Sequence, residues 1–350
     1  MVVVLYIVFF IFCIAAENSS KTQKNVFLAI TLVAVSLMAG YRDVAFWPDT
    51  PGYRAAFLSN TPSFSNYVFG SNPPDYQDKG FFFLSVLIKT LTSDWVAYAT
   101  IIAFIGLWIL IKGINKYSMF PLFAFALYMS RFMFGRQFIQ IRAGVSIAIV
   151  FWGMQYVAKR DLKRYLVVIF VASLLHMSAW IALPAYFLHK IKLKPKHIYW
   201  SIGVAFVLAA FFTPVIRSFI SESAADINVA QSYTTEEYGY KSTGKGLANP
   251  MVYYQTLILV LFTFWEKKLS KVTPYYITLR NGYFYSTIWL ITLCSYSVLS
   301  ARGSTILATY EILIIPSFVR IFHKNNRVLA YLLVGALSVL WFYLNLSKRA

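Results

Sequence analysis

Arg142 is the residue whose surroundings most demand an explanation. It lies in residues 138–152, a run that is otherwise apolar except for Gln140 and Ser146. An arginine inside a membrane-spanning segment costs about 2.5–3.5 kcal/mol on insertion scales, so a carboxylate, a cavity lined by carbonyl groups or an anionic ligand must offset that cost. Two interpretations stay open. One is an ion pair, for example with Glu311; the other is binding of a phosphate, which planar guanidinium matches with two parallel hydrogen bonds.

Two further arginines indicate similar chemistry. Arg42 ends an apolar stretch, and Arg302 lies in a predicted outer turn, residues 300–303, between two predicted helices. Snorkelling to the membrane interface would also explain Arg42, and an ordinary turn would explain Arg302. Three arginines on the outer side, where basic residues are few, favour an anion site over three unrelated positions. Arg131 and Arg136 either join this patch or anchor helix ends.

His176 and Asp49 are the candidate proton acceptors. His176 is the one histidine away from the basic stretches, and an imidazole, with an unperturbed pKa of about 6.5, suits a general base at neutral pH. A core histidine bonded to a backbone carbonyl is the structural alternative. Asp49 lies in a turn shaped by Pro48, Pro51 and Gly52, where it either caps the following helix or serves as a second candidate base.

Metal and cofactor motifs are missing from the sequence. No group of His, Asp and Glu has the spacing of metal ligands, and there is no P-loop, dinucleotide-binding glycine loop or G-x-S-x-G element. We therefore expect neither a metal nor a cofactor. Cys13 and Cys294 both lie in apolar runs, which excludes a disulfide framework.

The composition places these residues in a membrane protein. Of 350 residues, 59% are hydrophobic and 13% are charged, against about 25% charged in an ordinary soluble domain. The mean hydropathy is +0.61. These values exclude a soluble enzyme, a disordered chain and a nucleic-acid-binding domain. The net charge of +19 fits cytoplasmic basic loops together with attraction to anionic lipid or an anionic substrate.

The apolar runs predict an all-α, polytopic helical bundle of roughly 10–12 membrane segments in a single domain, residues 1–350. We read residues 2–16 as a short first membrane helix rather than a cleaved signal peptide. Residues 81–92 are too short to span, and residues 165–188 form either one span or a broken pair. The predicted helices are 2–16, 26–40, 95–111, 119–134, 137–158, 197–216, 250–265, 281–300, 303–322 and 327–346.

Charge predicts the orientation. Two long polar loops of mixed charge, 41–80 and 217–249, are placed outside, where they shape a cavity, and the basic stretches are placed in the cytoplasm. Loop 41–80 and Lys159 then lie on opposite sides of the membrane, so an odd number of helices must cross between them. The three predicted helices after residue 92 already supply an odd number. Residues 81–92 are therefore interfacial or re-entrant. Residues 165–188 must turn back near His176, and such a break needs protein or a wet cavity around it. The basic stretches are 21–24, 159–164, 190–197, 266–280 and 320–327.

Four short motifs, taken in order, resemble the EpsG-like branch of the Wzy polymerases. One departure is Ala143-Gly144 directly after Arg142, where that family often has Gln. The motifs are Ala39-Gly40-Tyr41-Arg42 with Asp49, Thr50 and Tyr53; Gln140-Ile141-Arg142-Ala143; residues 172–179 around His176; and Arg302 through Tyr310-Glu311 to Pro316.

The resemblance implies an enzyme at the outer face of the bacterial inner membrane. Such enzymes transfer a growing glycan from an undecaprenyl diphosphate carrier to a sugar hydroxyl of the next lipid-linked repeat. It implies that Arg142 and Arg302 bind the diphosphate, that Arg42 with Asp49 orients the substrate, and that His176 is the base. Tyr53, Arg136 and Gln140 are further expected substrate contacts. Expected partners are the lipid-linked oligosaccharide, the bilayer, a chain-length regulator and a repeat-unit flippase, and no nucleic acid.

Other functions remain open at this stage. A polyprenyl-phosphate-sugar-dependent glycosyltransferase would use a carboxylate of the first outer loop, Asp43 or Asp49, usually with a metal. An O-antigen ligase-like enzyme would share the donor, and a lipid-linked oligosaccharide transporter would show an internal repeat, which we do not find. A membrane O-acetyltransferase would need a cytoplasmic acyl donor. The sugars, and whether the product is O-antigen, capsule or exopolysaccharide, stay open, as does sugar stacking by Tyr233, Tyr238 and Tyr240.

Overall fold

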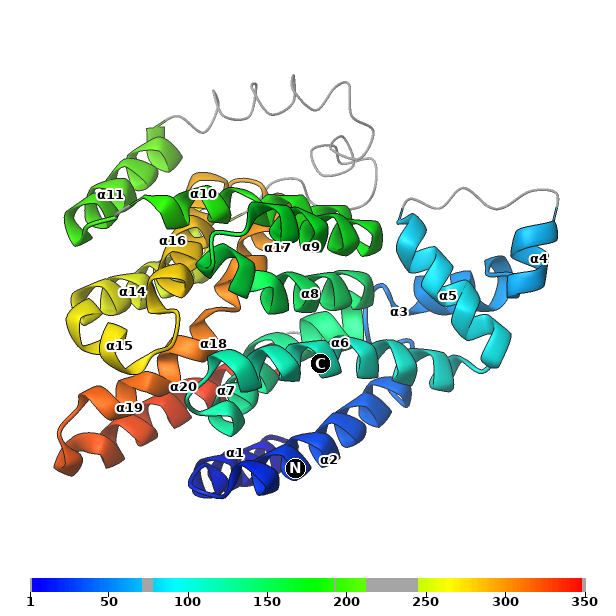
Figure 1. Cartoon of the computed structure of the whole chain (residues 1–350), viewed down its shortest axis with the longest axis horizontal. Coiled ribbons are helices and arrows are strands. Elements are labelled where there is room, and N and C mark those ends of the chain that lie inside the picture. Colours follow the sequence, from blue (N-terminus) through cyan, green and yellow to red (C-terminus); the bar gives the residue numbers. More distant parts are fainter. Residues whose placement is uncertain (1, 71–77, 192, 212–244, 348–350) are drawn as a thin grey trace. The chain divides into compact units, whose positions relative to one another are not determined.

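The computed structural model describes residues 2–70, 78–191, 193–211 and 245–347. All regular elements in these ranges are helices, which confirms the predicted all-α class (Figure 1). Five helices are long and apolar enough to cross a membrane, and three shorter apolar helices accompany them, Val2–Ala16, Met177–Leu188 and Pro250–Phe264. The chain is therefore a polytopic helical membrane protein, while the total of 10–12 segments stays a prediction. The five long helices are Lys21–Gly40, Trp95–Tyr117, Ile141–Ala158, Val298–Ile321 and Arg327–Ser347.

The chain folds as two compact units. Unit 1 contains residues 1–180, 272–274 and 312–350, and unit 2 contains residues 181–271 and 275–311. The site residues up to His176 therefore belong to unit 1, and Arg302 belongs to unit 2. A single domain over residues 1–350 stays a prediction.

Four helices of unit 1 pack one against the next. They are α2 (Lys21–Gly40), α6 (Trp95–Tyr117), α8 (Ile141–Ala158) and α9 (Leu162–Leu175), and each contacts its neighbour in this order (Figure 1). Local caps fix the starts of α6 and α9, because the side chain of Asp94 accepts the Ala97 N–H at α6 and that of Asp161 accepts the Arg164 N–H at α9. Three of the candidate residues, Arg42, Arg142 and His176, lie at the ends of these helices.

The segment between α2 and α6 folds into short helices, α3 (Thr50–Ala55), η1 (Ala56–Asn60), α4 (Phe64–Phe69) and α5 (Lys79–Leu91). At 13 residues, α5 is too short to span a bilayer, as expected, and its interfacial placement stays a prediction. The segment is anchored by an apolar cluster that α6 and α8 complete. Its members are Phe57, Phe81, Ile88, Trp95, Tyr98, Ala99, Ile102, Ile141 and Val145.

The break before α8 differs from the prediction. The sequence suggested a break between 134 and 137, but α7 (Pro121–Tyr128) continues into the π-helix η2 (Met129–Ile139), and the break comes at Gln140. The helix continues through Gly135 as a wider π turn, because the Gln140 N–H donates to the carbonyl five residues earlier, that of Gly135, at 2.8 Å. From α20 (Arg327–Ser347), Asn345 donates to the Ser130 carbonyl at 3.0 Å and helps hold this turn. The helix α1 (Val2–Ala16) packs on α7 and α20.

In unit 2, α16 (Tyr276–Thr292) contacts α10 (Pro184–Lys190), α11 (Pro195–Phe211), α14 (Pro250–Phe264) and α17 (Ser297–Ala308). A helix so surrounded is buried on most sides, which fits its many buried residues. The remaining elements between residues 246 and 326 are short, and those after Glu311 belong to unit 1. They are η5 (Gly246–Ala248), α15 (Glu266–Val272), α18 (Glu311–Ile314), η6 (Ile315–Ser317), α19 (Phe318–Ile321) and η7 (Lys324–Asn326).

Of the two helix breaks predicted near His176 and at Arg302, the structure confirms only the first. The break near His176 is confirmed, because α9 ends at Leu175, His176 is extended, and the 3-10 helix η3 (Met177–Ala182) follows. The predicted turn at Arg302 is wrong, because α16 ends at Thr292 and α17 runs through Arg302. Gly303 serves close packing there instead, since an added Cβ would lie 2.2 Å from the Trp289 indole nitrogen.

Candidate functional site

A buried carboxylate joins Arg142 to His176 in unit 1. Asp78 Oδ2 lies 2.6 Å from Arg142 Nη1 and 3.8 Å from His176 Nδ1. The Asp78 side chain is only 3% exposed, whereas Arg142 is 26% exposed. The open interpretation of Arg142 as an ion pair therefore gains a partner within its own unit, Asp78, while the suggested pair with Glu311 stays a prediction. Glu311, in unit 2, accepts a hydrogen bond from Tyr283.

Arg142 projects from the first turn of α8, beside the break at Gln140. Its Nε donates to the Tyr53 hydroxyl at 3.3 Å, and its Cζ lies 5.4 Å from the centre of the Tyr53 ring. These contacts orient the guanidinium while leaving part of it accessible. Tyr53 and Arg142 are thus in direct contact, while the expected contact of Tyr53 with substrate stays a prediction.

The end of α9 fixes the place of His176. The buried Ser146 hydroxyl of α8 donates to the Ala172 carbonyl at 2.8 Å and lies 3.5 Å from the His176 carbonyl. The His176 N–H donates to the Ala172 carbonyl as the last helical bond. Beyond it the chain departs from the helix, so that the imidazole is presented at the helix end with its side chain 12% exposed.

Asp78 reaches this point because α5 begins directly against the end of α9. An added Cβ at Gly80 would lie 2.6 Å from Leu174 Cβ and 2.8 Å from the Leu174 carbonyl oxygen, so only glycine allows this approach. Burial raises the pKa of Asp78 above its ordinary value, while Arg142 and the Met177 N–H both oppose that rise by favouring the charged form. Among the neighbours of Asp78, Arg142 is the one that most favours the charged form of the carboxylate.

Arg42 is held by a second set of contacts. Its Nε donates to the Thr50 hydroxyl at 3.3 Å, and Nη1 donates to the Ala39 carbonyl. The Thr50 hydroxyl in turn donates to the Phe138 carbonyl at 3.0 Å, and the guanidinium lies 5.2 Å from the centre of the Trp95 ring. Burial lowers the pKa of Arg42 to about 10, so it remains charged at neutral pH. Snorkelling into water is the wrong description of this side chain, because it is 6% exposed.

Asp49 occupies the position before α3 but does not cap that helix with its side chain. Its backbone has φ 38°, in the left-handed region that is unfavourable for a residue other than glycine. Its carbonyl accepts the Tyr53 N–H at 3.0 Å. The capping interpretation of Asp49 is therefore wrong, and its role as an alternative base stays a prediction.

The other two expected contacts of unit 1, Arg136 and Gln140, lie in η2 and at the break before α8. The Arg136 side chain is buried in η2 with its Cζ 4.3 Å from the centre of the Phe132 ring. Gln140 forms the break before α8 and its carbonyl accepts the Gly144 N–H. Gly144 permits η2 to lie on α8, since a Cβ there would be 2.3 Å from the Arg136 carbonyl oxygen. This contact accounts for glycine at the position where the sequence departs from the expected motif. Substrate contacts by Arg136 and Gln140 stay predictions.

Arg302 is half-buried on α17 of unit 2, where its carbonyl accepts the Thr305 hydroxyl. Its predicted share in the diphosphate site stays a prediction. Most of loop 217–249, with Tyr233, Tyr238 and Tyr240, lies outside the described residues, as do residues 71–77 of loop 41–80.

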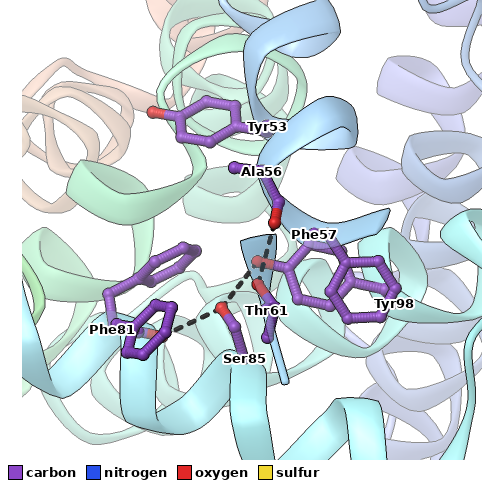
Figure 2. Close-up of a pocket in the computed structure, with 8 residues that line it drawn as sticks. Tyr53, Ala56, Phe57, Thr61, Phe81, Ser85 and Tyr98 are labelled. Carbon is purple, nitrogen blue, oxygen red and sulfur yellow. Dashed lines mark hydrogen bonds between the residues drawn. The ribbon is translucent and has the colours of Figure 1, made fainter. Parts of the chain in front are cut away.

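A small pocket lies beside Tyr53 (Figure 2). Its polar wall is already bonded within the protein, because Ser85 Oγ lies 2.9 Å from the Tyr98 hydroxyl and the Thr61 hydroxyl donates to the Ala56 carbonyl. The free volume of the pocket, about 10 Å³, has room for about one water molecule. The pocket is too small for a sugar ring. It is lined by Tyr53, Ala56, Phe57, Thr61, Phe81, Phe82, Ser85 and Tyr98.

Sequence analysis missed Asp78. The signal that would have found it is the cost of Arg142 itself, which calls for a buried carboxylate at the same end of the bundle. Asp78 is a suitable candidate because it directly precedes α5, whose apolar run begins at Phe81. Together the three groups can bind an anion through Arg142 and move a proton through His176.

Comparison with protein families decides what kind of protein carries this site. The model of the EpsG family matches residues 25–350, nearly the whole chain. The chain belongs to the EpsG family. This membership confirms the resemblance of the four motifs and points to a membrane protein of the polysaccharide-polymerase type. Neither the curated proteins nor the solved structures contain a match.

Proposed function

We propose that this EpsG-family protein is a membrane glycosyltransferase that polymerises undecaprenyl-diphosphate-linked oligosaccharide repeats at the outer face of the bacterial inner membrane. Family membership supports the general class. The observation that carries the proposal is the convergence of an accessible arginine, Arg142, and a histidine, His176, on one buried carboxylate.

The reaction needs both of these groups. A hydroxyl oxygen of the acceptor repeat attacks the anomeric carbon of the donor glycan and forms the new glycosidic bond. The bond from that carbon to the diphosphate oxygen breaks, and undecaprenyl diphosphate leaves with the electron pair. The hydroxyl proton passes to His176, which releases it to water afterwards.

Arg142 acts on the leaving group. Its guanidinium offers parallel N–H donors to the diphosphate, and the charge that develops as the bond breaks is stabilised more strongly than the charge of the bound donor. Arg302 is proposed as a second diphosphate contact. Arg42 is proposed to position the substrate near Tyr53, because Arg42 is fixed to the start of α3, the helix that carries Tyr53. A repeat-unit flippase and a chain-length regulator are proposed partners, and O-antigen, capsule and exopolysaccharide are alternative products.

Complementation tests the proposal. A strain that makes the cognate repeat but lacks its polymerase should regain a ladder of long glycans with the wild-type chain and lose it with Arg142→Ala or His176→Ala. Arg164→Ala is the matched control, since Arg164 is 70% exposed on α9, and it should keep the ladder. Protein amounts in the membrane must be equal. Long glycan in the strain without the chain, or a full ladder with Arg142→Ala, would contradict the proposal.

A further inference from the structure

One carboxylate oxygen serves two functional side chains. Asp78 Oδ2 is the atom that pairs with Arg142 Nη1 at 2.6 Å and also the atom nearest His176 Nδ1 at 3.8 Å. The Met177 N–H adds a third polar contact to the same carboxylate. Arg142 and His176 come from different helices, so Asp78 is the link between them.

We propose that Asp78 is a positioning residue that couples binding of the donor diphosphate at Arg142 to activation of His176. This inference rests on the proposed function. Without donor, Asp78 pairs with Arg142. When the diphosphate binds Arg142, the Asp78 carboxylate is released from the arginine and can pair with His176 instead.

The exchange follows from the cost of a buried charge. A carboxylate that is 3% exposed needs a cationic partner, and losing that partner without replacement costs several kcal/mol. His176 becomes such a partner once it takes the proton of the acceptor hydroxyl. The Asp78 charge therefore favours proton transfer to His176 most when Arg142 is occupied by the diphosphate, which is when the reaction can proceed.

The geometry also selects the nitrogen that reacts. Nδ1 is the nitrogen nearest Asp78, at 3.8 Å, so the carboxylate that Arg142 releases would bond the Nδ1 proton after a small approach. The acceptor hydroxyl then delivers its proton to Nε2. An aspartate that fixes the tautomer and stabilises the imidazolium performs the same task in hydrolases with a Ser-His-Asp triad.

Competition for Arg142 gives the proposal a distinctive signature. Asp78 holds Arg142 in the absence of donor, so removing its charge should improve binding of the diphosphate while it slows the chemical step. Asp78→Asn keeps the size of the side chain. Asp94→Asn is the matched control, because Asp94 is an exposed cap of α6 on the same stretch of chain.

Two measurements on the purified full-length chain in lipid nanodiscs test this. Asp78→Asn should bind undecaprenyl diphosphate about 3–10 times more tightly than wild type, by release of the Arg142 contact. Its kcat should fall by about 10–100-fold with no rise in the KM for the lipid-linked donor. Asp94→Asn should match wild type in both, and Asp78→Glu should recover most of kcat. Weaker diphosphate binding, or an unchanged kcat, in Asp78→Asn would overturn the coupling role.

The outcomes separate this inference from the proposed function. Loss of turnover in Arg142→Ala and His176→Ala with normal turnover in Asp78→Asn overturns only the role of Asp78. If Asp78→Asn does not accumulate in the membrane, Asp78→Asn combined with Arg142→Gln removes both charges of the pair. That double variant should be about 10 times slower than Arg142→Gln alone if Asp78 acts on His176; equal rates would overturn the inference.

Discussion

Replacing Gly80 by alanine should disable the site from a position that touches no substrate. The new Cβ would lie 2.6 Å from Leu174 Cβ, 2.9 Å from the Leu174 carbonyl carbon and 2.8 Å from its oxygen. Ordinary contact begins at 3.4 Å, so the start of α5 and the end of α9 must separate by roughly 0.8 Å. Asp78 lies two residues before Gly80 and His176 two residues after Leu174, and this separation therefore pulls the carboxylate from its partners.

The expected loss of stability and of elongation rate in Gly80→Ala follows from two independent effects. Overpacking of this kind costs about 1–3 kcal/mol of stability. A misplacement approaching 1 Å at a catalytic group costs about 100-fold in rate. We therefore expect Gly80→Ala to reach the membrane in reduced but measurable amounts and to polymerise about 10–100 times more slowly per molecule.

Gly52→Ala is the matched control, because nothing lies within 4 Å of a Cβ at that position in α3. The assay is the rate of glycan elongation by each variant, divided by the amount of folded protein measured by size-exclusion chromatography in detergent. If Gly80→Ala elongates glycan as fast as Gly52→Ala, the close approach of α5 to α9 does not position the site, and the reasoning is refuted.

Three further predictions address the other contacts. Arg142→Lys should lower kcat by about 10-fold or more while retaining membrane amounts, because an ammonium cannot make the paired hydrogen bonds of guanidinium; wild-type turnover would contradict this. Thr50→Val should lower the unfolding temperature more than Thr50→Ser, since it leaves Arg42 Nε and the Phe138 carbonyl buried without their hydroxyl, at a cost of about 1–3 kcal/mol; equal temperatures would refute the role of the hydroxyl. Burial raises the pKa of Asp78, so the folded chain binds this proton more tightly than the unfolded chain. The stability of wild type relative to Asp78→Asn should therefore fall as pH rises from about 4 through the raised pKa, and thermal unfolding across pH that shows a constant or rising difference would count against it.

Much of the fold could be predicted from the sequence because apolar runs have clear lengths. The runs that form α1, α6, α14 and α20 were placed at their observed starts, and the break at His176 followed from charge and parity. The π-helical turn of η2 was missed because its extra residue per turn leaves no local signal. Gly303 was taken for a turn because a glycine that serves helix packing looks the same in sequence.

The site was predicted in part for a related reason. Arg142 and His176 are visible because polar residues are costly in apolar runs. Asp78 lies in a polar loop with other carboxylates. The cost of Arg142 calls for a carboxylate partner, and the approach of Gly80 to Leu174 shows which one it is. Tertiary contacts of this kind depend on how α5 meets α9, which periodicity does not specify.

The most direct test of the central claim is the stoichiometry of the leaving group. Purified wild-type chain in nanodiscs, supplied with lipid-linked repeats from the polymerase-deficient strain, should release one undecaprenyl diphosphate for each glycosidic bond formed, and His176→Ala and Arg142→Ala should release far less. Elongated glycan without release of undecaprenyl diphosphate, or release at the wild-type rate from both variants, would contradict the account.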